Sequence, residues 1–188
     1  MIISVLLNHS LSSSDKLSLI IPQIIAVLII LFLILPLHEL AHGWVAYKFG
    51  DRTAKNAGRL TFNPLVSIDP WGALMILLFG FGWARPVPVN PNNFKNPRVG
   101  MAVTAAAGPI SNFLAALIGA FIYVSVLVGS GFSVSQLSFG MELLWTFIAI
   151  NISLAVFNLI PIPPLDGSKI LASFLIKFND NIPSNCVS

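Results

Sequence analysis

The stretch Leu35-Pro36-Leu37-His38-Glu39-Leu40-Ala41-His42-Gly43-Trp44 determines how this chain of 188 residues is interpreted. It ends an apolar run, because residues 17–37 contain no ionisable side chain. Two histidines and a glutamate then follow within five residues. An ionisable side chain at membrane depth costs about 2.5–3.5 kcal/mol and by default marks a functional site. The pattern therefore indicates a functional site built into a hydrophobic helix.

The composition is that of an integral membrane protein. Hydrophobic residues make up 56% of the chain and charged residues only 9%, whereas soluble domains contain about 25% charged residues. The chain has the length of one domain. The net charge is +3, and the basic residues are scattered over the predicted loops. This distribution argues against a nucleic-acid partner and favours a role of the basic residues in membrane orientation. The single cysteine, Cys186, excludes an internal disulfide and a multi-cysteine metal site.

Three apolar segments are long enough to cross a bilayer as helices, at about residues 19–47, 100–128 and 141–159. A further apolar segment, residues 71–83, is too short to span and is interrupted by Gly80 and Gly82, so we expect it to be re-entrant. The alternating prolines in residues 85–89 then require extended chain. The predicted fold is an all-α polytopic membrane protein with three core transmembrane helices and a short re-entrant or extended segment at about 71–90.

The remaining segments define the boundaries of one membrane-embedded domain. We expect this domain at residues 17–178, between an N-terminal tail at 1–16 and a polar C-terminal tail at 179–188. The N-terminal stretch lacks a basic region and a clear cleavage site, so we do not expect a cleaved signal peptide. Pro36 lies inside the first helix, where it should remove a backbone hydrogen bond and kink the helix just before the histidines.

The distribution of lysine and arginine predicts the orientation in the cell membrane. If residues 71–83 crossed the bilayer, the basic residues on either side of them would lie on opposite faces. If that segment is re-entrant, these basic residues share one face, and the loop at 129–140, which contains no lysine or arginine, lies on the other. The positive-inside rule favours the second arrangement. We therefore expect the N-terminus outside and the regions of His38 and Asp166 together on the cytoplasmic side.

The spacing of the histidines predicts a metal site. His38 and His42 are four residues apart, so on a helix their directions differ by only about 40° and both can bind one ion. Glu39 would lie beside that ion without pointing at it, as a general base for bound water requires. The alternative is a structural pair of histidines that form hydrogen bonds between helices.

The third ligand must come from elsewhere in the chain, because catalytic zinc takes three protein ligands and leaves one position for water. Glu142 is the only other glutamate, but it begins the third helix at its outer end, a membrane thickness away from His38. Asp166 follows the inner end of that helix and is the only acid there before Asp180. We therefore predict one Zn2+ ion bound by His38, His42 and Asp166.

Two motifs resemble the site-2 protease family of intramembrane zinc metalloproteases. His38-Glu39-Leu40-Ala41-His42 fits the HExxH motif of that family. Asn158-Leu159-Ile160-Pro161-Ile162-Pro163-Pro164-Leu165-Asp166-Gly167 fits its NxxPxPxLDG motif at every defined position. Shorter similarities lie at residues 58–64, 85–90 and 108–112. The resemblance extends from residue 36 to about residue 171.

This resemblance implies a short prokaryotic member of the family. The loop at 129–140 has no room for the PDZ domain of larger members, and we expect no CBS module after about residue 178. The resemblance implies zinc bound by the three predicted ligands and catalysis by Glu39. It also places Asn112 and Asn158 near the active site, where they would hold the substrate or the oxyanion. The alternative for both asparagines is that they tie helices together.

The implied function is hydrolysis of a peptide bond within or near a transmembrane helix of a membrane-protein substrate, that is, regulated intramembrane proteolysis. The extended segment at 85–90 either binds an unwound substrate by strand addition or is an ordinary re-entrant turn. Two alternative functions are a divalent-metal transporter and an inactive family member that binds membrane helices. No histidine follows His42 and residues 100–128 contain no acid, which argues against a transport pathway. The intact ligands and Glu39 argue against an inactive member.

Overall fold

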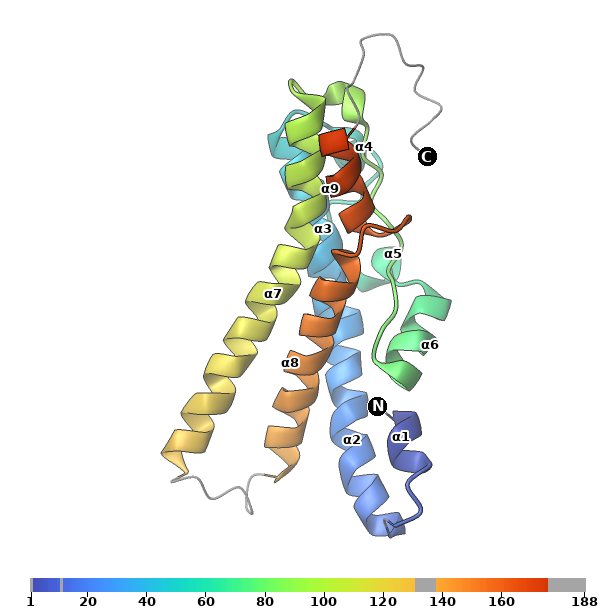
Figure 1. Cartoon of the computed structure of the whole chain (residues 1–188), viewed down its shortest axis with the longest axis vertical. Helices are drawn as coiled ribbons and strands as arrows, with labels where there is room; N and C mark the ends of the chain where they lie inside the picture. Colours follow the sequence, from blue (N-terminus) through green and yellow to red (C-terminus); the bar gives the residue numbers. More distant parts are fainter. Residues whose placement is uncertain (1, 11, 131–137, 176–188) are drawn as a thin grey trace.

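The computed structural model describes residues 2–10, 12–130 and 138–175, and every regular element within them is a helix. Three helical runs in these residues are long and apolar enough to cross a membrane: Ser13–Lys48, Pro97–Gly129 and Phe139–Asn158. They lie side by side along the long axis of the molecule (Figure 1). The prediction of an all-helical membrane protein with three core helices is confirmed. The predicted C-terminal tail at 179–188 lies outside the described residues.

The first helical run begins earlier than predicted. It consists of α2 (Ser13–Ile29), the π-helix η1 (Ile30–Ile34) and α3 (Leu35–Lys48). We expected a start at about residue 19, but Ser12 caps the helix. Its hydroxyl accepts a hydrogen bond from the Asp15 N–H at 3.2 Å and donates one to Asp15 Oδ2 at 2.7 Å. A short helix precedes it in the predicted N-terminal tail, α1 (Ile2–Leu6).

The π-helix η1 lies just before the histidines. The N–H of Leu35 donates to the carbonyl of Ile30, five residues back, which widens the turn compared with an α-helix. Pro36 follows in the first turn of α3, where its missing N–H is tolerated. The predicted disturbance of the helix at Pro36 therefore takes the form of a π-helical segment.

The core is apolar, and so is much of the outer surface. The first helical run packs with α6 (Pro70–Phe79) and α8 (Ser138–Asn158) around a cluster of buried side chains: Val27, Ile30, Ile34, Leu35, Ile76, Ile150 and Leu154. The outer face of α7 (Pro97–Gly129) carries large apolar residues, with Phe121 75% exposed. Such a surface is stable in contact with lipid. The molecule is therefore a multi-pass membrane protein.

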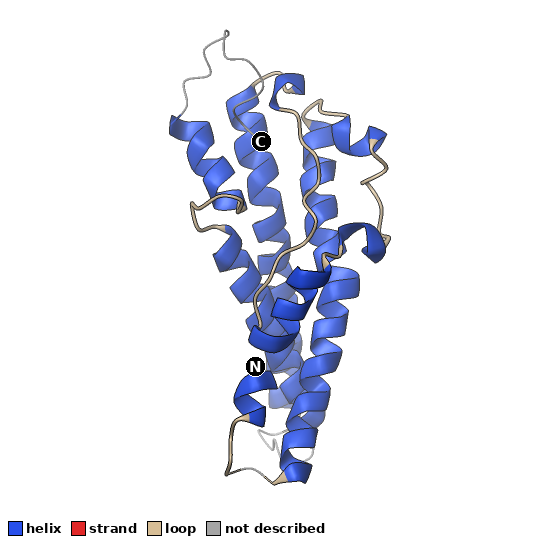
Figure 2. Cartoon of the chain, turned by 90° about the vertical axis from the view of Figure 1, so that its right-hand side faces the viewer, coloured by secondary structure: helices blue, strands red, loops and turns tan. Residues whose placement is uncertain are grey.

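A short helix and the extended loop that follows it form the predicted non-spanning segment. The helix α6 has ten residues and is followed by the capping residue Gly80, whose φ of +84° favours glycine. The chain then reverses and runs as a loop back toward the other end of the molecule (Figure 2). Gly82 allows this reversal, because a Cβ atom there would lie 2.7 Å from Ile76 Cγ1.

The remaining elements are short and pack against α3, η1 and α7. Two short helices lie in the connection between α3 and α6: α4 (Thr53–Asn56) and α5 (Pro64–Ser67). A third, η2 (Pro91–Asn93), lies between the extended segment and α7. The last described helix, α9 (Asp166–Leu175), packs against α7 (Figure 1). This packing brings the region after the third span back to the α3 helix.

Candidate metal centre and active site

The helix α3 carries two histidines with their side chains together. His38 is 4% exposed and His42 is 7% exposed. Their Nε2 atoms are 3.1 Å apart, and the two rings meet at 83°. Nitrogen ligands of one tetrahedral zinc ion, each bonded at about 2.0–2.1 Å, lie about 3.3 Å apart. The separation of the two nitrogens therefore suits two ligands of one ion.

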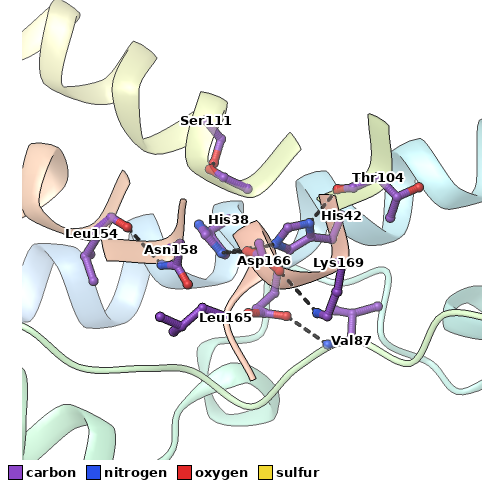
Figure 3. Close-up of polar contacts among 12 residues, drawn as sticks. His38, His42, Val87, Thr104, Ser111, Leu154, Asn158, Leu165, Asp166 and Lys169 are labelled. Carbon is purple, nitrogen blue, oxygen red and sulfur yellow. Dashed lines mark hydrogen bonds and ion pairs between the residues drawn. The ribbon is translucent and has the colours of Figure 1, made fainter. Parts of the chain in front are cut away.

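Asp166 reaches the histidines from the far end of the sequence. It is the first residue of α9 and follows a turn that contains the cis peptide bond between Pro163 and Pro164. Its Oδ2 lies 3.0 Å from His42 Nε2 and 3.5 Å from His38 Nε2 (Figure 3). The three candidate ligand atoms lie within 4.8 Å of one another. The structure thus brings together the three residues predicted as ligands.

The surroundings of these atoms fit a divalent metal ion. Two histidines and a carboxylate are a ligand set of catalytic zinc, which leaves a fourth position for water. Gly108 of α7 faces the two histidines. A Cβ atom there would lie 2.6 Å from His38 Nε2 and closer still to His42 Nε2. Among the described residues, no other group of three histidine, cysteine or acidic side chains is close enough to hold an ion.

A backbone carbonyl orients one of the histidines. The Nδ1 of His42 lies 2.7 Å from the carbonyl oxygen of Thr104 on α7. A carbonyl can only accept, so Nδ1 carries the proton and the lone pair of Nε2 is left free to bind a metal ion. His38 Nδ1 is buried and has no hydrogen-bond partner among the described residues. A hydrogen bond therefore fixes the ring orientation of one candidate ligand, His42, whereas His38 has no such bond within the described residues.

A lysine supports the carboxylate ligand. Lys169 lies one turn along α9, with its Nζ 3.2 Å from Asp166 Oδ1, so Oδ2 faces the histidines. Burial alone would raise the pKa of the Asp166 carboxyl, but its close contacts with His38, His42 and Lys169 together hold that pKa well below its usual range. Asp166 is therefore anionic, as a candidate ligand of a cation should be.

Glu39 lies beside the ligand group and contacts a different part of the chain. It is 6% exposed, and its Oε2 accepts a hydrogen bond of 2.9 Å from the Val87 N–H in the extended segment. Two cavities border Glu39 and Asp166, with volumes of about 350 Å³ and 140 Å³. The larger one also borders His42 and the smaller one His38. Both cavities therefore give space for water and substrate next to the candidate ligands.

The other polar residues singled out in the sequence occupy different positions. Asn158 lines the smaller cavity and donates to the carbonyl of Leu154 in its own helix at 2.9 Å. Asn112 is fully buried, and its amide has no hydrogen-bond partner among the described residues. Neither residue forms a hydrogen bond to another helix in the part of the chain that the structure describes. Glu142 lies outside the ligand group, 3.4 Å from Gln23 Nε2.

Four contributors to the site were not predicted from the sequence. The Thr104 carbonyl and the Val87 N–H are backbone groups, which any residue type supplies, so no side-chain pattern reveals them. Gly108 lay in a matched motif, but its contact with the histidines requires knowledge of how α7 packs. Lys169 could have been found, because a position three residues after Asp166 on a helix lies on the same face.

Comparisons with known proteins agree with this geometry. The profile of peptidase family M50 matches residues 26–138 and 132–187. YwhC of Bacillus subtilis, which carries a zinc metalloprotease name, is 46% identical over 151 residues, which cover 80% of this chain and 68% of YwhC. Zinc metalloprotease MJ0392 of Methanocaldococcus jannaschii is 31% identical over 149 residues, which cover 79% of this chain and 34% of that protein.

A third relative extends the comparison to another bacterium. Rip2 of Mycolicibacterium smegmatis, which also carries a zinc metalloprotease name, is 29% identical over 140 residues, which cover 70% of this chain and 50% of Rip2. The chain thus spans between a third and just over two thirds of the length of these relatives. No solved structure matches the chain at a significant level.

Proposed function

The chain belongs to peptidase family M50, and on this premise we propose that it is an intramembrane zinc metalloprotease. The proposal depends on one observation: ligand atoms of His38, His42 and Asp166 lie within 4.8 Å of one another, and Glu39 follows His38 on the same helix. The zinc metalloprotease names of the relatives favour Zn2+ as the ion. We propose a transmembrane protein as the substrate, because the site lies at the end of an apolar, membrane-spanning helical run.

In the proposed mechanism, each residue has one task. His38, His42 and Asp166 would hold the ion, which would act as a Lewis acid that activates water and polarises the scissile carbonyl. The carboxylate of Glu39 takes a proton from the attacking water and delivers it to the leaving amine. We propose that Asn158 holds the substrate or the oxyanion, and its position at the smaller cavity supports this role.

The way the substrate binds follows from the backbone of the extended segment. A transmembrane helix hides its amides in hydrogen bonds, so the cleaved part must unwind first. The segment at 85–90 has four N–H groups, and three already donate, to Ser67 O, Glu39 Oε2 and Asp51 Oδ2. Only the Val89 N–H is left, whereas strand addition requires several donors in alternation. We therefore propose that the unwound substrate lies in the cavities and is not added as a strand to this segment.

We propose that the N-terminus lies outside the cell and that the site opens to the cytoplasm. Most basic residues lie in α9, at the end of α3, at the start of α7 or in the loops beside them: Lys48, Arg52, Lys55, Arg59, Lys95, Arg98 and Lys169. The opposite end of the bundle carries Asp15, Lys16 and Glu142. The positive-inside rule assigns the basic end to the cytoplasm.

A divalent-metal transporter is the competing function. A transporter needs ligands at several depths along a pathway. Within the described residues, one group of side chains could hold an ion, and it is the group at His38. This observation favours a catalytic site over a transport pathway.

The proposed function is tested with purified protein in liposomes and a labelled single-span substrate. We expect cleavage by the wild type and a loss of at least a hundredfold in the Glu39→Gln variant, because glutamine cannot take a proton from water. The variant should retain its bound zinc. Equal cleavage by both proteins would contradict the mechanism, and zinc flux into empty liposomes would favour the transporter.

A further inference from the structure

We propose that the extended segment at 85–90 positions the catalytic glutamate through a single backbone group, the N–H of Val87. This inference rests on the proposed function of Glu39. The N–H of Val87 donates to Glu39 Oε2 at 2.9 Å. Val87 is 8% exposed and Glu39 is 6% exposed. A hydrogen bond to a carboxylate is strong in such a buried place, so it fixes the direction of the glutamate side chain.

The sequence around Val87 makes this donor rigid. Pro86 and Pro88 lack N–H groups, so Val87 provides the one donor between Arg85 and Val89. Each proline fixes its own φ and keeps the residue before it extended. The direction of the Val87 N–H is therefore set by the chain itself, independently of its valine side chain.

An arginine anchors the chain immediately before Val87. The guanidinium of Arg59 donates to the carbonyls of Val66, Arg85 and Pro86 at 2.9, 2.6 and 3.2 Å. Guanidinium groups present several donors in a fixed plane, which suits three carbonyls from two segments. Arg59 thus fixes the residue before Val87 against the loop that contains α5.

A buried aspartate anchors the chain after Val87. Asp51 is fully buried, and its Oδ2 accepts from the Asn90 N–H at 2.8 Å, while its Oδ1 accepts from Asn93 Nδ2 at 2.7 Å. Asp51 lies three residues after the end of α3, the helix that carries Glu39. The extended segment is therefore anchored next to the end of α3, the same helix that carries the glutamate it orients.

This arrangement assigns different tasks to the two carboxylate oxygens of Glu39. Oε2 is occupied by the Val87 N–H, which leaves Oε1 as the oxygen that exchanges a proton with water and with the leaving amine. A free glutamate side chain has several rotamers, and holding it in one of them before the reaction removes an entropic cost from the catalytic step. Val87 is thus a positioning residue.

The test compares two proline substitutions in the same segment. Val87→Pro removes the N–H that holds Glu39. Val89→Pro removes an N–H that makes no hydrogen bond within the described residues, so it is the matched control. We expect kcat to fall about tenfold to a hundredfold in Val87→Pro relative to Val89→Pro, with similar KM, bound zinc and thermal stability. Equal kcat values, or a higher kcat in Val87→Pro, would overturn the inference.

Hydrogen exchange measured by mass spectrometry tests the contact without any cleavage assay. A peptide that covers residues 85–90 should exchange one more amide in Glu39→Ala than in the wild type, and no more in the control Glu142→Ala. Unchanged exchange in Glu39→Ala would overturn the inference even if Val87→Pro failed to fold. The two proposals fail separately: full activity of Glu39→Gln removes the proposed function, whereas an inactive Glu39→Gln with a fully active Val87→Pro removes only this inference.

Discussion

The candidate site has two walls that are built in different ways. The helical wall consists of α3, α7 and α9, whose backbone groups are satisfied within each helix, so that mostly side chains face the metal position. The extended wall consists of residues 85–90, whose backbone groups depend on partners elsewhere: Ser67 O and the side chains of Glu39, Asp51 and Arg59. Apart from Glu39, whose role is catalytic, changes in the helical wall should therefore act on the ion, and changes in the extended wall should act on catalysis or stability.

The largest effect is expected in the helical wall, at the position that gives the ion its space. Gly108→Ala would place a Cβ atom 2.6 Å from His38 Nε2, so the ion and the methyl group cannot both fit. We expect zinc affinity to fall by more than about a hundredfold, measured by competition with a chelator. The control is Gly129→Ala in the same helix, where a Cβ atom has no neighbour within 4 Å. Equal affinity in the two variants would show that the helical wall does not shape the metal site.

The next effect concerns the third ligand. Asp166→Ala removes the anionic ligand and should lower zinc affinity about a hundredfold, since two histidines remain. Glu142→Ala should leave zinc affinity unchanged, because Glu142 lies outside the ligand group. Zinc content after dialysis against a chelator distinguishes the two variants. A loss of zinc in Glu142→Ala alone would reverse the assignment.

For Asp51, which anchors the extended wall, the expected effect is on stability. Asp51→Ala removes a fully buried carboxylate that accepts several hydrogen bonds, among them those from the Asn90 N–H and Asn93 Nδ2. We expect the free energy of unfolding to fall by about 2 kcal/mol, measured in detergent. Zinc affinity should change little, because Asp51 does not contact the ligands. A strong loss of zinc would mean that the two walls are not independent.

The pKa of Asp51 predicts how the stability of the fold depends on pH. Burial would raise the pKa of Asp51, but hydrogen bonds from Asn93, Thr53 and Asn90 lower it more, so the pKa lies below its usual value. A carboxyl with a lowered pKa in the folded state stabilises the fold above its unfolded pKa of about 3.9, and this contribution is lost as the pH falls through the folded pKa. The stability difference between wild type and Asp51→Asn should therefore shrink below about pH 4. A constant difference at all pH values would contradict this assignment.

The smallest effect is expected at Lys169. Its side chain is 40% exposed, so its ion pair with Asp166 is partly screened by solvent. Lys169→Met should lower zinc affinity only about twofold to fivefold, in the same chelator competition. Lys95→Met, another substitution of a lysine outside the site, serves as the control. A hundredfold loss in Lys169→Met would show that the lysine acts on the ion as strongly as a ligand.

The two walls also differ in how far the sequence predicts them. The three spans and two of the candidate ligands were predictable from the local sequence, because apolar length and the spacing of His38 and His42 are local properties. Asp166 was predictable only through the expected topology, which brings the inner end of the third span to the histidines. Ser12 and Asp15 contained a signal for the earlier start of the first helix, which has the form of a capping box. The contact between Val87 and Glu39 had no such signal, because a backbone N–H belongs to every residue except proline.

The π-helix η1 sets the rotational phase of the site. A π-type turn contains about one residue more than an α-helical turn, so the residues after it are rotated by about 100° from where an unbroken α-helix would place them. Deleting one residue within Ile30–Ile34 would turn His38 and His42 away from Gly108, while the apolar length of the span would hardly change. The first span therefore encodes two separate quantities, its length and its phase, and the metal ligands depend on the second.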